Sequence, residues 1–349
     1  MKKGQAFFYL NANDKIGSGH FWRCLSIANE LIKFDVSISF LYSSLHDSLA
    51  ELLQQNNYSA YQLNDITAGN FIEIVNSKNT DNNTSLIIID SDNISFYKKE
   101  FQLNIIGADI RLMLITVNPD FHYYAHIVLN QNIIACHQNY SVENYTRPLL
   151  GPEYFIYTPQ FRKIGIQPVK PIRKNIFISF GSADPCHFTF QLMNKILNER
   201  YFDSFSFHVV VGSLNQDYEN IKKLCELHQD HVQLYHNIPD VSNVMLKCDL
   251  AICAPGLMYW ELALMGVRSV LFSSSLREKK ISLFLHDNGY AYTFHQYDEI
   301  FNDEKFELFR TFLSMIKEEY FYNFSALRKK INPEGINKIC SEIDNVLKN

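Results

Sequence analysis

Short apolar runs alternate with amphipathic segments along most of the chain. In the first half, the apolar runs are candidate strands at Gln5–Leu10, Val36–Leu41, Ser85–Asp90, Arg111–Val117 and His126–Leu129. Between them, apolar residues recur at helical spacing in three segments, which are His20–Lys33, Ser44–Asn56 and Asn70–Ser77. Strands that alternate with helices in this way predict a mostly parallel, doubly wound α/β sheet.

The second half of the chain repeats the same alternation. Its candidate strands are Asn175–Phe180, Phe207–Val211, Val232–His236, Leu250–Cys253 and Ser269–Leu271. Its expected helices are His187–Arg200, Gln216–His228, Val241–Lys247 and Tyr259–Met265, followed after residue 302 by helical signals that end in Asn337–Lys348. Two halves of this kind predict two Rossmann-like domains.

A proline-containing segment separates the two halves. Phe161–Lys174 reads FRKIGIQPVKPIRK, with two prolines, one glycine and five basic residues. Proline interrupts both helices and central strands, so this composition is typical of a linker. We therefore expect an N-terminal domain over residues 1–164, a linker over 165–174 and a C-terminal domain over 175–349.

Composition and charge narrow the class of protein. The 349 residues are 47% apolar and 20% charged, which excludes a mainly disordered chain. The net charge of −5 argues against a nucleic-acid partner. Mean hydropathy is −0.14 and no run of about 18 apolar residues occurs, so we expect no stable membrane insertion. The apolar stretch Ala6–Leu10 is too short for a signal peptide, which predicts a cytoplasmic protein.

Cysteine and histidine positions do not indicate a metal site. The seven cysteines are scattered and no C-x-x-C occurs, so neither a zinc site nor a disulfide framework is predicted. The pairs His122/His126 and His228/His231 have spacings that suit metal ligands, but no cysteine or carboxylate constellation accompanies them. We expect no metal and no other cofactor.

A glycine-containing motif follows the first predicted strand and opens the first predicted helix. The segment Ile16–Cys24 reads IGSGHFWRC, in which Gly17 and Gly19 permit a tight turn and close approach of a ligand. Trp22 stands where a dinucleotide fingerprint requires glycine. The helix start disfavours a charged imidazolium, so His20 is suited to act as a general base. A histidine that caps the helix or packs under the loop fits the spacing equally well.

Two loop–helix turns in the second half are candidate anion sites. Ile178–Pro185 contains a strand and a Gly-Ser turn, and Asp249–Glu261 contains a strand and a loop with Gly256. Backbone N–H groups at such turns bind phosphate oxygens without a metal. Glu261 lies where a carboxylate could accept both hydroxyls of a ribose, although a capping role for this residue is the alternative.

Together these segments resemble the nucleotide-sugar enzymes of GT-B architecture. They are most similar to the UDP-sugar hydrolase family of bacterial pseudaminic acid synthesis (UDP-2,4-diacetamido-2,4,6-trideoxy-β-L-altropyranose hydrolase), which groups with predicted glycosyltransferases of spore-coat polysaccharide synthesis. The resemblance covers roughly residues 5–295 and rests on six blocks in order. The blocks are Gly17-Ser18-Gly19-His20 with Arg23-Cys24-Leu25, Leu129-Asn130-Gln131-Asn132, Leu149-Leu150-Gly151-Pro152-Glu153-Tyr154, Ser179-Phe180-Gly181-Ser182-Ala183-Asp184-Pro185, His236-Asn237-Ile238 and Trp260-Glu261-Leu262-Ala263.

The resemblance implies two Rossmann-like domains whose parallel sheets face each other across a cleft. It also implies roles for particular residues. His20 matches the proposed catalytic histidine, Glu261 the ribose-binding glutamate, and Ile238 the position whose backbone holds uracil. The diphosphate would meet the backbone amides of Gly181, Ser182, Gly256 and Leu257. The residues expected on the substrate side are Gly17, Gly19, Arg23, Asn130 and Gln131, where Arg23 is suited to contact a phosphate or a partner carboxylate.

The chain also departs from the family pattern. Where the family has Asp-His-Tyr after the fourth strand, this chain has Asp90-Ser91-Asp92-Asn93. Asp92 is therefore a second catalytic candidate, which could orient water or bind the sugar, with an Asx turn as the alternative. The usual Gly-Gly is Pro255-Gly256, and an Asn-Gln pair is replaced near Arg277-Glu278-Lys279-Lys280.

The function that the resemblance implies is hydrolysis of a UDP-activated acetamido sugar at its anomeric carbon. UDP and free sugar would be released for nonulosonic (pseudaminic-type) acid and surface glycan synthesis, with His20 as the base that activates water. The alternative is a GT-B glycosyltransferase that passes the sugar from a UDP-sugar to a glycan or lipid acceptor. A non-catalytic nucleotide-sugar binding protein and a UDP-sugar 2-epimerase are further alternatives.

Overall fold

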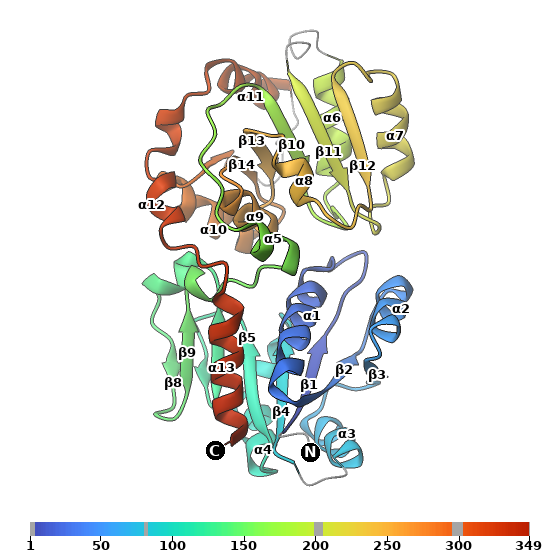
Figure 1. Cartoon of the computed structure of the whole chain (residues 1–349), viewed down its shortest axis with the longest axis vertical. Helices are drawn as coiled ribbons and strands as arrows, with labels where there is room; N and C mark the ends of the chain where they lie inside the picture. The colour runs from blue at the N-terminus through green and yellow to red at the C-terminus, as the bar shows by residue number, and fades with distance from the viewer. Residues whose placement is uncertain (1–3, 80–82, 199–204, 295–302, 349) are drawn as a thin grey trace. The chain divides into compact units, whose positions relative to one another are not determined.

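The computed structural model describes residues 4–79, 83–198, 205–294 and 303–348 (Figure 1). The chain divides into two compact units. Unit 1 comprises Met1–Pro159 together with Asn332–Asn349, and unit 2 comprises Gln160–Ile331. The last two residues of the predicted helix His187–Arg200 lie outside the described residues.

Unit 1 is built on a seven-stranded parallel sheet of order β3-β2-β1-β4-β5-β7-β9. The strands are β1 Gly4–Leu10, β2 Val36–Tyr42, β3 Ser59–Gln62, β4 Ser85–Asp90, β5 Arg111–Ile115, β7 Ile127–Asn130 and β9 Arg147–Leu150. Two short strands, β6 His122–Tyr123 and β8 Ser141–Val142, form a separate parallel pair. The helices are α1 Gly19–Leu31, α2 Asp47–Gln55, α3 Ala68–Lys78, α4 Lys99–Gly107 and α13 Gly335–Lys348.

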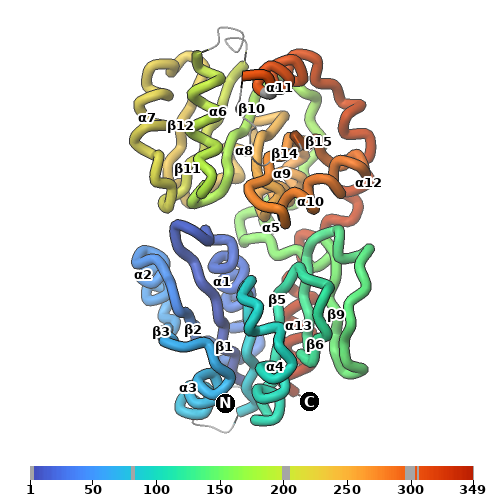
Figure 2. The backbone as a smooth tube through the Cα atoms, turned by 180° about the vertical axis from the view of Figure 1, so that it is seen from behind, coloured from blue at the N-terminus to red at the C-terminus, as the bar shows by residue number. Residues whose placement is uncertain are grey.

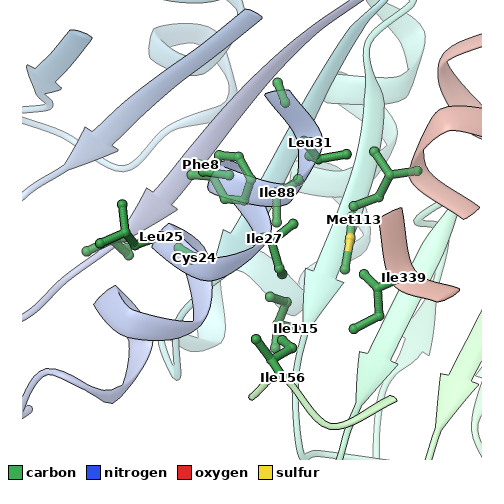
Figure 3. Packing of buried hydrophobic residues seen from close by; sticks show 14 of the residues in the cluster. Phe8, Cys24, Leu25, Ile27, Leu31, Ile88, Met113, Ile115, Ile156 and Ile339 are labelled. Carbon is green, nitrogen blue, oxygen red and sulfur yellow. The ribbon is translucent and has the colours of Figure 1, made fainter. Parts of the chain in front are cut away.

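Helices cover both faces of this sheet, which explains why its central strands are apolar throughout. All seven residues of β1 are buried, and Phe8 packs with α1 and α13 whereas Phe7 packs with α3 and α4. Figure 3 shows the first of these cores, in which Ile27 and Ile339 approach the sheet from the two helices. In Figure 2 the sheet is seen from the side that carries α4, with α13 behind it.

The C-terminal helix belongs to unit 1, not to the second domain to which the sequence analysis assigned it. Along α13, Ile336, Ile339, Ile343 and Leu347 recur at helical spacing and are almost completely buried. They pack in the same core as α1, so the chain returns to unit 1 after Ile331. Helical periodicity identifies an apolar stripe, but it does not reveal which sheet the stripe covers.

The segment expected to be a linker is fixed to unit 2, and the first boundary between the units lies at Pro159 instead of near residue 165. Lys170 donates hydrogen bonds from Nζ to the carbonyl oxygens of Leu246 at 2.6 Å and Cys248 at 2.9 Å. At Gly266, where φ is +75°, a Cβ atom would overlap the carbonyl oxygen of Pro168. The proline-containing segment therefore packs closely on unit 2.

Unit 2 contains a six-stranded parallel sheet of order β12-β11-β10-β13-β14-β15. The strands are β10 Asn175–Ser179, β11 Ser206–Val211, β12 Val232–His236, β13 Leu250–Cys253, β14 Arg268–Phe272 and β15 Tyr292–Phe294. The helices are α5 Pro159–Ile164, α6 Phe188–Leu197, α7 Tyr218–Glu226, α8 Ser242–Met245, α9 Leu257–Leu264, α10 Leu276–Asp287, α11 Asp303–Met315 and α12 Phe324–Arg328. The prediction of two α/β units with parallel sheets is confirmed.

Within the described ranges, no helix combines the length and the apolar character needed to cross a membrane.

Candidate functional site

The centre of the unit 1 sheet brings the glycine-containing motif next to the end of β4. From β1 the chain moves outward to β2 and β3, and then returns to place β4 on the other side of β1. Loops after these two central strands leave in opposite directions, which is where ligands bind in open α/β sheets. Because Leu10 pairs with Asp90, the loop after β1 and the last residue of β4 meet at this edge.

Three side chains meet there. The His20 Nδ1 atom lies 2.6 Å from Asp90 Oδ1. Arg23 donates from Nε to Asp90 Oδ2 and from Nη2 to Asp90 Oδ1, each at 2.7 Å. The Asp90 side chain is 1% exposed, whereas His20 and Arg23 are 13% and 15% exposed. We call His20, Arg23 and Asp90 the histidine cluster.

The acceptor character of Asp90 determines which nitrogen of His20 carries the proton. Asp90 can only accept a hydrogen bond, at 2.6 Å from Nδ1, whereas Arg23 Nη2 can only donate one and lies farther away, at 3.1 Å. The shorter contact favours a proton on Nδ1, which His20 donates to Asp90. In neutral imidazole the other nitrogen, Nε2, then holds a free electron pair. No protein group of the described residues hydrogen-bonds Nε2, which leaves this atom available to a ligand.

The charges in the histidine cluster support each other. Burial alone would raise the pKa of the Asp90 carboxyl, but Arg23 and His20 outweigh burial and hold that pKa well below its usual range. Burial opposes the charge of Arg23, yet the Asp90 carboxylate raises the pKa of the guanidinium above its usual value. Asp90 and Arg23 therefore form a permanently ionised pair.

The loop between β1 and α1 is shaped by the Asn13 side chain and by a glycine with positive φ. Asn13 Oδ1 accepts hydrogen bonds from the amides of Lys15 and Ile16, each at 3.0 Å, which fixes an Asx turn. Gly17 has φ +79° and no atom within 4 Å of the place where a Cβ would lie. The alternative that His20 caps α1 is not seen, because its ring turns to Asp90 instead.

The remaining predicted residues of unit 1 do not join the histidine cluster. Asn130 and Gln131 are buried, and they hydrogen-bond to Tyr140 and to the amide of Ile156. Their polar groups support the chain around β7 instead of facing an open site. Asp92 is exposed on the loop after β4, and it is Asp90, two residues earlier, that binds the His20 ring. Asp90 is the residue that sequence reasoning did not select.

The corresponding edge of unit 2 carries the glycine turns. Gly181 and Ser182 follow β10, while Gly256 and Leu257 follow β13, and β10 and β13 are the adjacent central strands. Gly181 has φ +92°, and the Cβ position of both glycines is free of atoms within 4 Å. Ile238 follows β12 on the same edge of the parallel sheet. The structure thus gathers the predicted nucleotide-binding residues along one edge of unit 2.

Helix α6 has few free N–H groups for an anion, because the side chain of a nearby residue caps its first turn. Asp184 is buried and accepts hydrogen bonds from the amides of Phe188 at 3.0 Å and Thr189 at 2.7 Å. Helix α9 has no such cap, because its N-cap residue is Gly256 and no side chain bonds to its first amides. Its backbone N–H groups remain available to an anion.

Glu261 is a partly buried carboxylic acid without a hydrogen-bond partner among the described residues. It is the fifth residue of α9, partly exposed, and makes no side-chain hydrogen bond to its own helix. Burial raises its pKa from 4.5 to about 7. The expected alternative of a capping carboxylate is therefore not seen, and the side chain can accept hydrogen bonds from a ligand.

The side chains of His122 and His126, one of the two pairs considered for metal binding, have other partners. His122 contacts Ser141 at 2.7 Å and Glu143 at 3.0 Å on the surface, and His126 accepts a hydrogen bond from the amide of Leu112. Burial lowers the pKa of His126 to about 4. Within the residues that the structure describes, no three metal-ligating side chains come together.

Comparison with solved structures defines the class of fold, which is that of the GT-B glycosyltransferases. Acinetobacter baumannii MurG aligns with a TM-score of 0.65 at 16% identity over 98% of this chain and 99% of its own. Phytolacca americana UGT2, complexed with UDP-2fluoro-glucose and pterostilbene, aligns with a TM-score of 0.64 at 12% identity over 99% of both chains. The spinosyn rhamnosyltransferase SpnG has a TM-score of 0.63 at 10% identity over 96% and 99%.

Sequence comparison adds two distant relatives. The uncharacterized protein MJ1062 of Methanocaldococcus jannaschii is 26% identical over 318 residues, which are 88% of this chain and 59% of that protein. The spore coat polysaccharide biosynthesis protein SpsG of Bacillus subtilis is 22% identical over 169 residues, or 48% and 50% of the two chains. The chain thus spans half to three-fifths of the length of these relatives. No protein-family model matches it.

Proposed function

We propose that this protein transfers a sugar from a UDP-sugar to a hydroxyl acceptor, with His20 as the general base. One observation carries the proposal, namely the hydrogen bond that directs His20 Nδ1 to Asp90 Oδ1 and leaves Nε2 free. An imidazole oriented in this way at the ligand edge of a parallel sheet is suited to remove a proton from an attacking hydroxyl.

The bond changes follow from this geometry. Nε2 of His20 takes the proton of the acceptor O–H group while the acceptor oxygen forms a bond to the anomeric carbon. The bond between that carbon and the UDP oxygen breaks, and its electron pair leaves with UDP. The imidazolium that forms is stabilised through Nδ1 by the Asp90 carboxylate, as in other histidine–carboxylate pairs. Loss of such base catalysis typically costs about 10²–10⁴-fold in rate.

Unit 2 would hold the nucleotide. Its open glycine turns at Gly181 and Gly256 offer backbone N–H groups to the diphosphate, where they would stabilise the charge that grows on the leaving group. The Glu261 carboxylate would accept hydrogen bonds from the ribose hydroxyls, and the backbone at Ile238 would meet the uracil.

Hydrolysis is the second candidate, with water in place of the acceptor hydroxyl. The resemblance of six sequence blocks to the UDP-sugar hydrolases of pseudaminic acid synthesis favours it, and suggests an acetamido sugar as the donor. Full-length fold similarity to glycosyltransferases and the relation to a spore coat polysaccharide protein favour transfer. In both reactions His20 and the nucleotide site have the same roles, and a cytoplasmic location fits either one.

The deciding experiment measures UDP release from a panel of UDP-hexoses and UDP-acetamido sugars, with and without glycan acceptors. Mass spectrometry identifies the sugar product. Transfer predicts UDP release that depends on an acceptor, together with a new glycoside, whereas hydrolysis predicts free sugar without an acceptor. UDP binding without turnover of any donor would contradict both reactions and leave a binding protein.

A matched pair of variants assigns the base. His20→Asn should lower turnover by about 10²–10⁴-fold while UDP binding persists. His122→Asn removes a surface histidine of the same unit, which pairs with Glu143, and should leave turnover unchanged. Near-native turnover by His20→Asn would remove His20 from the mechanism.

A further inference from the structure

The guanidinium of Arg23 is committed to Asp90. It approaches the carboxylate with two different N–H donors and reaches both carboxylate oxygens, each at 2.7 Å. Such paired bonds fix the plane of a carboxylate as well as its charge. The resulting orientation presents Oδ1 to the His20 ring. Its Nη2 atom also lies 3.1 Å from His20 Nδ1, so Arg23 is placed to act on the imidazole through Asp90 and directly through its charge.

The charge balance around His20 depends on the same pair. A buried carboxylate 2.6 Å from an imidazole favours the doubly protonated imidazolium, which has no free electron pair on Nε2. The positive charge of Arg23 offsets that carboxylate without removing its hydrogen bond. The remaining groups nearby are weaker: Asp92 lies on the loop after β4 and acts on Arg23, and burial raises the pKa of the Cys24 thiol, which stays neutral.

The β1–α1 loop adds no net charge to this balance. It carries one acidic and one basic residue before the glycines, Asp14 and Lys15, and both are exposed. The buried groups that face the ring thus comprise one carboxylate and one guanidinium. Removing either one would leave the other as an uncompensated charge beside His20.

We propose that Arg23 is a positioning residue whose paired bonds orient Asp90 toward His20 Nδ1, and whose positive charge beside the ring opposes the second proton that the Asp90 carboxylate alone would favour. This proposal rests on the proposed function in one respect, since a free electron pair on Nε2 matters for catalysis only if His20 is the base. The assignment differs from a substrate-binding role for Arg23. It predicts that changes at Arg23 alter the protonation of His20 even when no substrate is present.

Three variants separate charge from geometry. Arg23→Gln removes the charge, Arg23→Lys keeps the charge but supplies a single point donor, and Arg23→Gln/Asp90→Asn removes both charges while the Asn oxygen still accepts from Nδ1. The protonation state and tautomer of His20 are read from the ¹⁵N NMR shifts of its ring in the full-length protein without ligand. Circular dichroism reports whether each variant is folded.

The expected results differ among the variants. In Arg23→Gln the ring becomes imidazolium at pH values where the native ring is neutral, and the acidic limb of the pH–rate profile moves up by about one pH unit or more. In the double variant the ring is neutral again, but turnover stays low because the carboxylate that stabilises the imidazolium is gone. In Arg23→Lys the ring stays neutral while kcat falls, because the carboxylate is less well oriented.

Lys33→Gln serves as the control, since it removes an ion pair with Glu30 at the far end of the same helical segment. It should change neither the ¹⁵N shifts of His20 nor the pH–rate profile. A ring that stays neutral in folded Arg23→Gln would overturn the proposal, as would a ring that stays charged in the folded double variant. If Arg23→Gln does not fold, an imidazolium in Arg23→Lys or in the double variant overturns it. Failure of every donor to react would contradict the proposed function, but the NMR result would still decide the role of Arg23.

Discussion

The acidic side chains of Asp90 and Glu261 differ in whether the protein supplies hydrogen-bond donors to them. The buried carboxylate of Asp90 accepts hydrogen bonds from His20 and from two donors of Arg23, which replace the water that an ion requires. Glu261 has lost part of its water and has no protein partner in the described residues, so its pKa rises to about 7. The first group is built to stay charged without a ligand, whereas the second gains its partners when a ligand arrives.

The unsatisfied carboxyl of Glu261 predicts a pH-dependent gain of stability in Glu261→Gln. Because the pKa of Glu261 is about 7 in the folded protein and 4.5 ordinarily, folding disfavours the ionised form. The penalty is absent below pH 4.5, grows between pH 4.5 and 7, and is complete above pH 7. At about 1.4 kcal/mol per pH unit, the variant should be more stable than the native protein by at most about 3 kcal/mol at pH 8, and by less at pH 5.5.

Urea unfolding of the ligand-free protein at pH 5.5 and pH 8 measures this difference. Glu51→Gln, at an exposed position on α2, is the control and should change stability by less than about 0.5 kcal/mol at either pH. A stabilisation of Glu261→Gln that is the same at both pH values would show that the carboxyl is not desolvated. The opposite effect is expected for UDP affinity at pH 8, which should fall about tenfold as the ionic acceptor for ribose is lost.

At the scale of elements, the C-terminal helix α13 completes a core that is otherwise formed by N-terminal elements of unit 1. Ile339 is fully buried in the cluster that α1 and the unit 1 sheet share. Ile339→Ala should therefore destabilise unit 1 by about 2–5 kcal/mol. Ser341→Ala, at an exposed position of the same helix, should change stability by less than about 0.5 kcal/mol.

The two tryptophans report on the two units separately, since Trp22 lies in unit 1 and Trp260 in unit 2. With Trp260→Phe or Trp22→Phe as background, fluorescence during urea unfolding follows one unit at a time. Ile339→Ala should lower the midpoint of the Trp22 transition much more than that of the Trp260 transition. The reverse order would contradict the assignment of α13 to unit 1.

The elements that the sequence predicted are the ones whose pattern is set by full burial. β1, β4 and β13 are apolar runs covered on both faces, and they are recognisable without their neighbours. The elements that were missed carry weaker patterns. β3 has four residues, none of them buried, and the first turns of α10 read LREKK. Such segments acquire their structure from the strand or sheet that they pack against, which a local pattern does not contain.

The same limit applies to the site. The glycines and His20 form one continuous motif, so the sequence located the β1–α1 loop and the helix start. Asp90 lies 70 residues away and reaches His20 only because β4 is placed beside β1. An aspartate at the carboxyl end of a buried strand was the available signal. The resemblance drew attention to Asp92 instead, because the family pattern differs at that position.

At the scale of the whole molecule, the two units share one topology but offer different chemistry. Each has its switch in strand order at the centre of the sheet, between β1 and β4 in unit 1 and between β10 and β13 in unit 2. The first edge carries a histidine, an aspartate and an arginine, which suit proton transfer. The second carries open glycine turns and an uncapped helix, which suit an anion. Neither set alone provides both a leaving-group site and a base.

This division of chemistry predicts that UDP and an intact UDP-sugar protect different parts of the chain from hydrogen exchange. UDP alone should slow amide exchange at Gly181–Ser182 and Gly256–Leu257, because those backbone groups bind the diphosphate. An intact donor, bound to His20→Asn so that it is not consumed, should in addition slow exchange in the loop from Gly17 to Gly19. The exposed segment around Leu227 at the end of α7 is the internal control and should exchange equally in all states. Protection by the donor that never extends beyond unit 2 would mean that the sugar does not reach the histidine cluster, and His20 could not then be the base for its transfer.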